Sequence, residues 1–561
     1  MPAFSFLNRL AGKAGVLSLF AGALFLAAQP AMAEPVTYER LLHPDKEPHN
    51  WLTYSGNYNS HRHSALTQIK PSNVSKLQQK WVYQGAVMGN WQSSPLVVDG
   101  VMYLTQRPND VVALDARTGR AYWTYRYPTP ADQVACCGAN NRGLAISGDT
   151  LFMGTLDAHL VAVDTRSGRP IWNVEVTPYK DTGYSITMAP LIVKDKVLVG
   201  VGGGELGVRG FLAAYDVRTG KELWRRYTIP TPGEPGSETW ENDAWKTGGA
   251  PIWLTGSYDP ELNLTYWGTG NPSPDMNPAQ RPGDNLYSDS VIAVDPDTGE
   301  MKWHFQFTPH DPYDFDSVQV PMLVDMDWEG KPSKLMLWAN RNGFFYVLDR
   351  QTGRFLSGKP YVKVNWTDGL DANGRPSQPK VPVDILYPGV QGGTNWYSPS
   401  FSPRTGLFYF SAWENYGSRI RREPAVHQPG RMFMGGGWSV VAPVPGAPGT
   451  PAIRRGPINT WTEATGTGAV IAMDPATGKP RWKYEMTDVT DGGILTTASD
   501  LLFTGTREGY FHALDARTGK LLWKASAGAQ MVNGPVTYQV DGKQYVATIS
   551  GMSLVVYALP D

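Results

Sequence analysis

The stretch VVALDARTGRAYW at residues 111–123 decides the fold, because close copies of it return along the chain. Each copy has an apolar run, an Asp, a Thr-Gly or Ser-Gly pair and, with one exception, a Trp four residues after the Gly. The other copies are LVAVDTRSGRPIW at 160–172, LAAYDVRTGKELW at 212–224, VIAVDPDTGEMKW at 291–303, FYVLDRQTGRFLS at 345–357, VIAMDPATGKPRW at 470–482 and FHALDARTGKLLW at 511–523. A repeat of this kind is typical of propellers and related arrays.

Each copy predicts two strands joined by a tight turn, since Asp can cap the turn with its side chain and Gly accepts a positive φ. We expect the Trp to pack between neighbouring units. The longest gap between repeat aspartates, 125 residues from Asp349 to Asp474, contains a degenerate copy, FSPRTGLFYFSAW, at 401–413. The sequence therefore predicts an all-β fold, an eight-bladed β-propeller over residues 34–561, with its functional site on the axis.

The composition agrees with short strands and many turns: 60 Gly, 45 Pro, 20 Trp, 27 Tyr and 18 Phe, with 18% charged residues. Disorder and coiled coil are both disfavoured by these numbers. Two Pro- and Gly-rich stretches, 229–251 and 417–459, are too polar to be core strands. We expect them to be loops over one face of the propeller.

The first 33 residues have the pattern of a signal peptide: Arg9 and Lys13, an apolar run, and an A-x-A site ending at Ala33. Cleavage before Glu34 predicts a periplasmic protein without a membrane span. An N-terminal membrane anchor is the alternative, although the run is short for a span. Removing the segment changes the formal charge from −1 to −3, so no basic excess favours nucleic acid or an anionic membrane as partner.

The chain has two cysteines, Cys136 and Cys137, and they are adjacent. Export permits a disulfide between them, although bridging neighbours distorts the peptide bond that joins them. Two buried thiols are the alternative. A C-x-x-C-H motif does not occur in the sequence, so we expect no c-type haem on this chain.

Five further segments carry a family resemblance. They are ACCGANNRG at 135–143, GELGVRG at 204–210, WGTGNPSP at 267–274, TPHDPYDFD at 308–316 and NRNGFFYVLDR at 340–350. With the repeat, they resemble the soluble quinoprotein alcohol dehydrogenases that use pyrroloquinoline quinone (PQQ), over nearly the whole mature chain. The resemblance implies oxidation of a small primary alcohol to the aldehyde, with electrons passed to a separate soluble cytochrome c. Whether the protein forms a homodimer stays open.

The resemblance also assigns residues to a metal ion and to catalysis. By themselves Glu205, Asn271 and Asp314 are residues that turns and caps commonly use, but oxygen donors from three repeat units together suit a hard cation. The family places metal ligands at Glu205 and Asn271, and a catalytic base at Asp314 rather than Asp311. Asp314 would accept the alcohol proton while hydride passes to the quinone.

Arg341 matches an arginine that donates hydrogen bonds to the quinone oxygens. Asp316 separates two variants of the family, since it is a carboxylate in relatives that resemble lanthanide-dependent enzymes. A trivalent ion of near-calcium size gains from one more carboxylate, and it is the stronger Lewis acid. The sequence thus favours a lanthanide at Glu205, Asn271, Asp314 and Asp316, with Ca²⁺ as the alternative.

By the same resemblance, the quinone lies between a Cys136–Cys137 disulfide and the Trp253 ring. Its polar groups would contact several other side chains and amides, namely Gln92, Arg142, Thr187, Gly203, Gly204, Arg341 and Asn395. Three positions depart from the family pattern. Gln92 replaces a Glu of several relatives, Gly202 replaces a Ser, and Asp491 falls near a position where relatives place a cofactor-lining Trp.

Two other functions fit parts of the pattern. A non-catalytic scaffold of the outer-membrane assembly type shares the repeat, but such scaffolds usually have a Cys directly after the cleavage site, where this chain has Glu34. An aldose dehydrogenase using the same quinone would normally show another blade pattern or membrane helices. The preferred alcohol cannot be derived from the sequence, since it depends on loops over the axis.

Overall fold

The repeat folds as expected. In the computed structural model, which describes residues 34–89, 91–377, 379–381, 383–441 and 466–561, the first copy forms β5 (Asp110–Asp115) and β6 (Ala121–Tyr125), paired antiparallel. The Asp115 carboxylate accepts hydrogen bonds from the amides of Arg117 at 2.8 Å and Thr118 at 3.1 Å. Gly119 has φ 75°, a conformation that glycine adopts without steric cost. The segment 1–33, with its predicted signal peptide, lies outside the described residues.

Eight sheets of four strands form the blades within the described residues, and one of them gains a fifth strand. The first four blades follow the chain in order. The first consists of β3 (Leu96–Val98), β4 (Val101–Gln106), β5 and β6, and the second of β7 (Ala145–Ser147), β8 (Thr150–Gly154), β9 (His159–Asp164) and β10 (Pro170–Glu175). The third consists of β11 (Leu191–Val193), β12 (Lys196–Gly200), β13 (Phe211–Asp216) and β14 (Glu222–Tyr227). The fourth consists of β15 (Ser257–Asp259), β16 (Leu264–Gly268), β17 (Ser290–Val294) and β18 (Met301–Gln306).

The remaining blades include the degenerate copy and the blade that closes the ring. They consist of β19 (Met322–Trp328), β20 (Lys331–Ala339), β21 (Phe344–Asp349) and β22 (Phe355–Pro360); β23 (Ser400–Ser402), β24 (Leu407–Glu414), β27 (Thr467–Asp474) and β28 (Lys479–Met486); β29 (Ile494–Thr497), β30 (Leu501–Gly505), β31 (Tyr510–Asp515) and β32 (Leu521–Ser526), with β1 (His63–Ser64) added in parallel; β33 (Val536–Val540), β34 (Lys543–Ser550), β35 (Ser553–Ala558) and β2 (Gln78–Gln84). The predicted eight-bladed β-propeller is confirmed.

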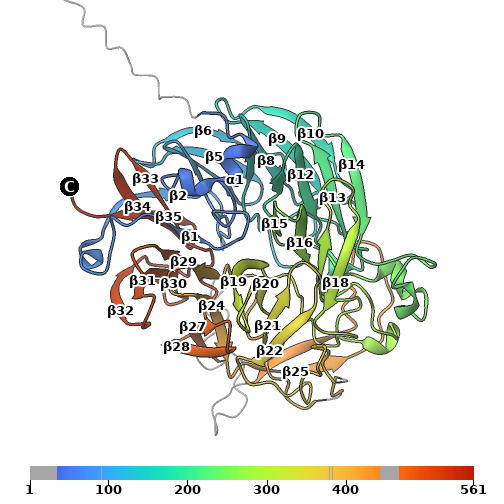
Figure 1. Cartoon of the computed structure of the whole chain (residues 1–561). Helices are drawn as coiled ribbons and strands as arrows, with labels where there is room; N and C mark the ends of the chain where they lie inside the picture. Colours follow the sequence, from blue (N-terminus) through green and yellow to red (C-terminus); the bar gives the residue numbers. More distant parts are fainter. Residues whose placement is uncertain (1–33, 90, 378, 382, 442–465) are drawn as a thin grey trace, which may run out of the picture. The chain divides into compact units, whose positions relative to one another are not determined.

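The two ends of the folded chain close the ring together. β2 pairs antiparallel with β35, so that Trp81 lies opposite Val556. In Figure 1 the blue β2 lies beside the red β33, β34 and β35. Closure of this kind leaves a sheet protein with few exposed edges.

The repeat tryptophans join successive blades, as predicted. Trp123 donates its indole N–H to the carbonyl of Thr165 in the next blade at 3.0 Å, and its ring covers the turn glycine Gly168. A Cβ on that glycine would lie 2.5 Å from the ring, so the Gly is required both by its turn and by its neighbour. The same pairing recurs in other copies as Trp172 with Gly220, Trp224 with Gly299, Trp303 with Gly353 and Trp482 with Gly519, and Trp81 of β2, outside the repeat copies, covers Gly119 in the same way.

Helices are short: α1 (Tyr38–Leu42) and 3₁₀ turns η1 (Pro44–Lys46), η2 (Val74–Lys76), η3 (Gly204–Leu206), η4 (Ser237–Thr239), η5 (Asp243–Thr247) and η6 (Pro278–Gln280). Among the described residues, none is long and apolar enough to cross a membrane.

The predicted loop at 417–459 begins with a separate two-stranded sheet, β25 (Gly417–Arg422) and β26 (Gly436–Val441), and its part after residue 441 lies outside the described residues. The connection between these strands runs to other blades. There the Phe433 amide donates to the carbonyl of Glu205 at 2.6 Å, and the Met276 amide donates to the carbonyl of Met434 at 2.8 Å. The loop therefore contacts the two segments that carry Glu205 and Asn271.

Candidate functional site

A cavity of about 240 Å³ lies where connections from several blades converge. Its lining includes Gln92, Cys136, Cys137, Arg142, Thr187, Gly203, Glu205, Trp253, Asp314, Asp316, Arg341 and Asn395. All but two of the predicted site residues therefore line this cavity. The two exceptions, Gly204 and Asn271, lie beside it and close to each other, since a Cβ on Gly204 would be 3.7 Å from the Oδ1 of Asn271.

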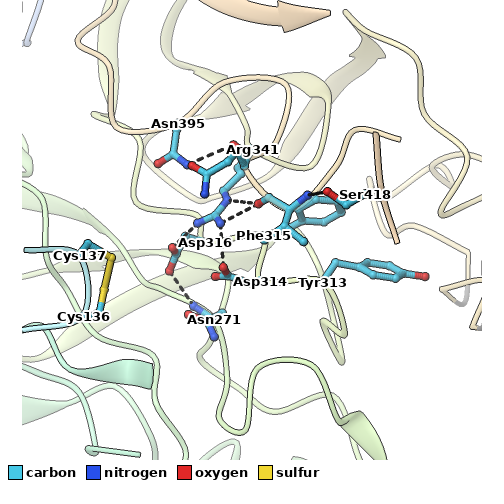
Figure 2. Close-up of polar contacts among 12 residues, drawn as sticks. Cys136, Cys137, Asn271, Tyr313, Asp314, Phe315, Asp316, Arg341, Asn395 and Ser418 are labelled. Atoms are coloured by element: carbon cyan, nitrogen blue, oxygen red, sulfur yellow. Dashed lines mark hydrogen bonds and ion pairs between the residues drawn. A yellow bond between two sulfur atoms is a disulfide. The ribbon is translucent and has the colours of Figure 1, made fainter. Parts of the chain in front are cut away.

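Arg341 organises the carboxylates of the site (Figure 2). Its Nη2 lies 2.9 Å from an oxygen of Asp314, and its Nη1 donates to Asp316. The guanidinium also donates to the carbonyl of Val390, from Nε at 3.0 Å and from Nη2 at 2.7 Å. Burial alone would lower the pKa of Arg341, but Asp314 and Asp316 outweigh it and raise that pKa. Arg341 is thus a fixed cation.

Asp316 has both of its oxygens engaged. Oδ2 receives Arg341, while Oδ1 accepts the backbone amide of Asn271 at 3.0 Å and the indole N–H of Trp253 at 3.3 Å. Asp316 therefore connects the proposed metal ligand Asn271 to the aromatic wall of the cavity. An ion bound here would share these oxygens with protein donors.

Asp314 and Asp311 differ in what their carboxylates do. Asp311 caps its own turn, since its oxygens accept the amides of Tyr313 at 2.9 Å and Phe315 at 2.6 Å. Asp314 lines the cavity, and its backbone has φ 62°, an uncommon conformation for a residue other than glycine. Burial raises the pKa of Asp314 well above its usual range against the opposing effect of Arg341. Of the two, Asp314 is the one available to a bound substrate.

Glu205 supplies a partly buried carboxylate from η3, between two glycines in the left-handed region, Gly203 with φ 114° and Gly207 with φ 71°. A Cβ on Gly203 would lie 2.4 Å from the carbonyl oxygen of Gly183, so only glycine fits there. Burial, and then the negative charge of Asp316, raises the pKa of Glu205 to about 7. A carboxylate held this way favours a cation beside it.

Arg142 is a buried cation whose contacts include no carboxylate among the described residues. Its guanidinium lies 4.9 Å from the ring centroid of Trp253 and 5.2 Å from that of Trp396, and Nη1 donates to Thr187 at 2.7 Å. Its Nε and the Oε1 of Gln92 are buried without hydrogen-bond partners there. Burial lowers the pKa of Arg142 to about 10. The lining therefore fits an anionic ligand, as the carboxylates of PQQ require.

Cys136 and Cys137 form a disulfide, and both line the cavity. The alternative prediction of two buried thiols is therefore wrong. A sulfur of each and an oxygen of Glu205 lie within 4.8 Å of one another. The disulfide and Trp253 thus belong to the walls of one cavity that also contains the carboxylates.

Sequence reasoning missed part of the cavity lining. Trp396, Gln391, Ser185 and Asn140 line the cavity, and Trp396 follows the predicted Asn395 directly, which was the available signal. Asn395 itself donates to the carbonyl of Gln391 at 3.1 Å. Asp491, which departs from the family pattern, is absent from the cavity lining and pairs with the buried Arg507 at 2.6 Å.

An eight-bladed propeller whose axial cavity offers oxygen donors to a cation and a buried arginine to an anion is a cofactor-binding fold. The model of the PQQ family, described as glucose/ethanol/alcohol dehydrogenase, beta-propeller domain, matches residues 51–383. A second, the outer membrane protein assembly factor BamB model, matches residues 466–558 only.

The chain is 39% identical to the quinoprotein alcohol dehydrogenase PedH of Pseudomonas putida, over 95% of this chain and 91% of that protein. It is 38% identical to the 1-butanol dehydrogenase (cytochrome c) of Thauera butanivorans, over 89% and 74%. A europium-containing methanol dehydrogenase has a similar structure, with TM-score 0.85 and 33% identity over 93% of this chain and 100% of that one. The chain belongs to the PQQ-dependent alcohol dehydrogenase family and is an oxidoreductase.

Proposed function

We propose that this quinoprotein alcohol dehydrogenase oxidises a small primary alcohol to the aldehyde with a lanthanide ion at its axial site. The observation that carries the proposal is the pairing of Asp314 and Asp316 through Arg341, in the cavity that Glu205 also lines. The Asp314 carboxylate can then act as a base, and the Asp316 carboxylate adds negative charge where the family places its metal.

The lining residues have separate tasks in this proposal. Glu205, Asn271, Asp314 and Asp316 would hold the ion. Trp253 and the Cys136–Cys137 disulfide would enclose the quinone rings, and Gln92, Arg142, Thr187, Gly203, Gly204, Arg341 and Asn395 would contact its polar groups. When bound, the quinone supplies the acceptor for hydride from the alcohol carbon, and the metal ion supplies a Lewis acid beside it.

Asp314 would accept the hydroxyl proton of the alcohol on a carboxylate oxygen. Its raised pKa makes it a stronger base than an exposed aspartate, and Arg341 holds that carboxylate in place at 2.9 Å. The side chains of Arg341 and Asp314 are only 5% and 15% exposed, which limits the access of water to the transferred proton. The alcohol loses one proton to Asp314 and one hydride from its carbon, which balances its oxidation to the aldehyde.

The choice of a trivalent ion rests on Asp316. An additional buried carboxylate stabilises a trivalent ion more than a divalent ion of the same size, because the Coulomb energy scales with ionic charge. The name of the europium-containing relative supports the same choice. A calcium enzyme with a solvated Asp316 is the alternative, although the Asp316 side chain is only 6% exposed.

Activity with the two metals tests the proposal. Full-length protein, freed of metal and supplied with PQQ, should oxidise a panel of primary alcohols with an artificial dye far faster with La³⁺ than with Ca²⁺. Asp316→Ala should lose the La³⁺-supported activity and keep its circular dichroism spectrum. Equal rates with Ca²⁺, or full activity of the variant, would refute the assignment of a lanthanide.

We further propose a periplasmic location and a separate cytochrome c as electron acceptor. The signal-peptide pattern before Glu34 supports the first. The name of the Thauera relative, 1-butanol dehydrogenase (cytochrome c), supports the second. Cell fractionation and reduction of added cytochrome c by the alcohol-treated enzyme are the corresponding measurements.

A further inference from the structure

A buried carboxylate outside the predicted site lies next to Glu205 and Asn271. Asp275 follows β16 in the turn that begins with Asn271, and it is 0% exposed. The Ser273 hydroxyl donates to the carbonyl of Gly204 and lies 3.5 Å from Oδ1 of Asp275. The side chain thus lies against the backbone that presents Glu205.

Among the residues that the structure describes, no Arg or Lys side chain forms an ion pair with the Asp275 carboxylate. Arg281 is the cation that most lowers its pKa, yet the guanidinium donates to the backbone carbonyls of Pro274 at 3.1 Å and Asp275 at 3.0 Å, and to Asn285 at 3.0 Å. Oδ2 of Asp275 is buried without a hydrogen-bond partner among the described residues. Such a group is costly in a folded protein unless a ligand compensates it.

The groups that Asp275 interacts with point to the ligand. Asp275 lies four residues after Asn271 in the same turn, and the Ser273 hydroxyl links its Oδ1 to the carbonyl of Gly204, the residue before Glu205. A Cβ on Gly204 would lie 3.7 Å from the Oδ1 of Asn271, so the two segments meet there. The unpartnered oxygen therefore belongs to the same electrostatic cluster as the proposed metal ligands, rather than to a separate structural ion pair.

Asp275 adds a negative charge to those of the proposed metal ligands. Glu205, Asp314 and Asp316 supply three carboxylates and Asp275 is a fourth, while the guanidinium of Arg341 pairs with Asp314 and Asp316. We propose that Asp275 is a metal-selecting carboxylate, whose buried charge favours a trivalent over a divalent ion at the Glu205–Asn271 site; this inference rests on the proposed function.

Coulomb's law makes the inference quantitative. A charge near the ion stabilises a trivalent ion 1.5 times as strongly as a divalent ion of equal size. Asp275→Asn should therefore weaken Tb³⁺ binding at least tenfold and Ca²⁺ binding by a smaller factor, with logarithmic losses in a ratio of about 3 to 2. Asp275→Glu keeps the charge and should retain most of the Tb³⁺ affinity.

Metal binding can be read without turnover. Full-length quinone-loaded protein is titrated with Tb³⁺ while its luminescence, sensitised by nearby tryptophans such as Trp253, is recorded, and Ca²⁺ affinity is obtained by competition. Asp259→Asn is the matched control, because Asp259 is buried in the same blade and pairs with Arg350 instead. Thermal unfolding and circular dichroism check that each variant is folded.

The outcomes separate this inference from the proposed function. Undiminished Tb³⁺ affinity in Asp275→Asn, or equal losses for Tb³⁺ and Ca²⁺, would overturn the role of Asp275 while leaving the lanthanide enzyme intact. A parent protein that fails to bind Tb³⁺ would overturn both. If Asp275→Asn does not fold, Asp275→Ser removes the same charge, and Asp275→Glu remains the variant that keeps it.

Discussion

Arg341 holds Asp314 with an Nη2 to carboxylate distance of 2.9 Å, and both side chains are largely buried. Arg341→Lys should lower kcat about 100-fold or more, because one ammonium group cannot reach Asp314, Asp316 and the Val390 carbonyl together. Steady-state kinetics with saturating PQQ and metal provide the measurement.

The control for this variant is Arg350→Lys. Arg350 also pairs with two carboxylates, Asp259 and Asp325, each at 2.7 Å, but it is absent from the axial cavity lining. We expect this variant to be less stable and to keep kcat. A kcat within threefold of the parent for Arg341→Lys would remove Arg341 from the catalytic group.

Arg142→Met should affect the apo-protein and the quinone complex in opposite directions. Removing a buried cation whose contacts include no carboxylate among the described residues should leave the free energy of unfolding of the apo-protein unchanged or raise it by about 1 kcal/mol. The lost charge-assisted contacts should weaken PQQ binding roughly tenfold to a hundredfold. Fluorescence titration and chemical denaturation measure the two effects.

Arg209→Met is the control, because Arg209 also stacks on aromatic rings, Tyr227 at 4.1 Å and Trp245 at 5.7 Å, outside the axial cavity lining. It should leave PQQ affinity unchanged. Equal PQQ affinity in Arg142→Met and the parent would contradict the assignment of Arg142 to the anionic quinone.

The disulfide can be tested by mass and by binding. Intact mass under denaturing conditions should rise by two hydrogens on reduction, since Cys136 and Cys137 are the cysteines of the chain. Replacing both with Ser should weaken PQQ binding while thermal unfolding changes little, because the pair lies at the cavity and closes only a very short loop. Unchanged affinity would show that the sulfur platform does not contact the quinone.

The packing of tryptophans on turn glycines of the next blade predicts that substitutions at two turn glycines differ in their cost to stability. Gly519 has φ 74° and a Cβ there would lie 2.6 Å from Trp482, whereas Gly542 has φ 76° with open space around it. Gly542→Ala should cost about 1 to 2 kcal/mol from backbone strain alone, and Gly519→Ala roughly 1 to 3 kcal/mol more from overpacking. Equal losses in chemical denaturation would mean that Trp482 moves aside freely.

Two histidines predict an acid-sensitive stability. Burial lowers the pKa of His61 and of His63 to about 4 in the folded protein, against about 6.5 in an unfolded chain. The unfolded state thus binds protons first, so the free energy of unfolding should fall as pH drops from 6.5 to 4, by about 1 to 3 kcal/mol per histidine.

His61→Gln, measured by urea denaturation between pH 7.5 and 4.5, isolates one of these contributions. In the parent protein the Nε2 of His61 lies 2.6 Å from the carbonyl of Leu323, a contact that the glutamine amide can keep. The variant should lose less stability over this pH range than the parent does. Parallel curves would assign the acid sensitivity to other groups.

The fold was predictable from the sequence because its determinants are local and repeated. The Asp-x-x-Thr-Gly turn and the following Trp act within one hairpin and its neighbour, so seven copies carry the same information. The degenerate copy at 401–413 was recognisable for the same reason. The site residues came from family motifs, and the cavity brings nearly all of them together.

The rest depends on contacts between distant segments. From the sequence, Asp275 looks like an ordinary turn residue. In the structure it is buried beside the segment of Glu205, which lies 70 residues earlier in the chain. Asp491 could not be placed because its partner is Arg507 in another loop. The contact of Phe433 with Glu205 joins segments of different blades, and a contact of this kind cannot be predicted from a repeat in the sequence.

Ring closure by β2 and β35 makes the propeller dependent on residues 536–558, which supply three strands of the closing blade. A chain that stops before β33 would already contain every residue lining the cavity, yet Gln78–Gln84 would have no sheet to join. Trp81 would then cover Gly119 without support from its own blade. Chains that stop before β33 should therefore remain open at this blade and be more susceptible to proteases than the full sequence, although their cavity residues are all present.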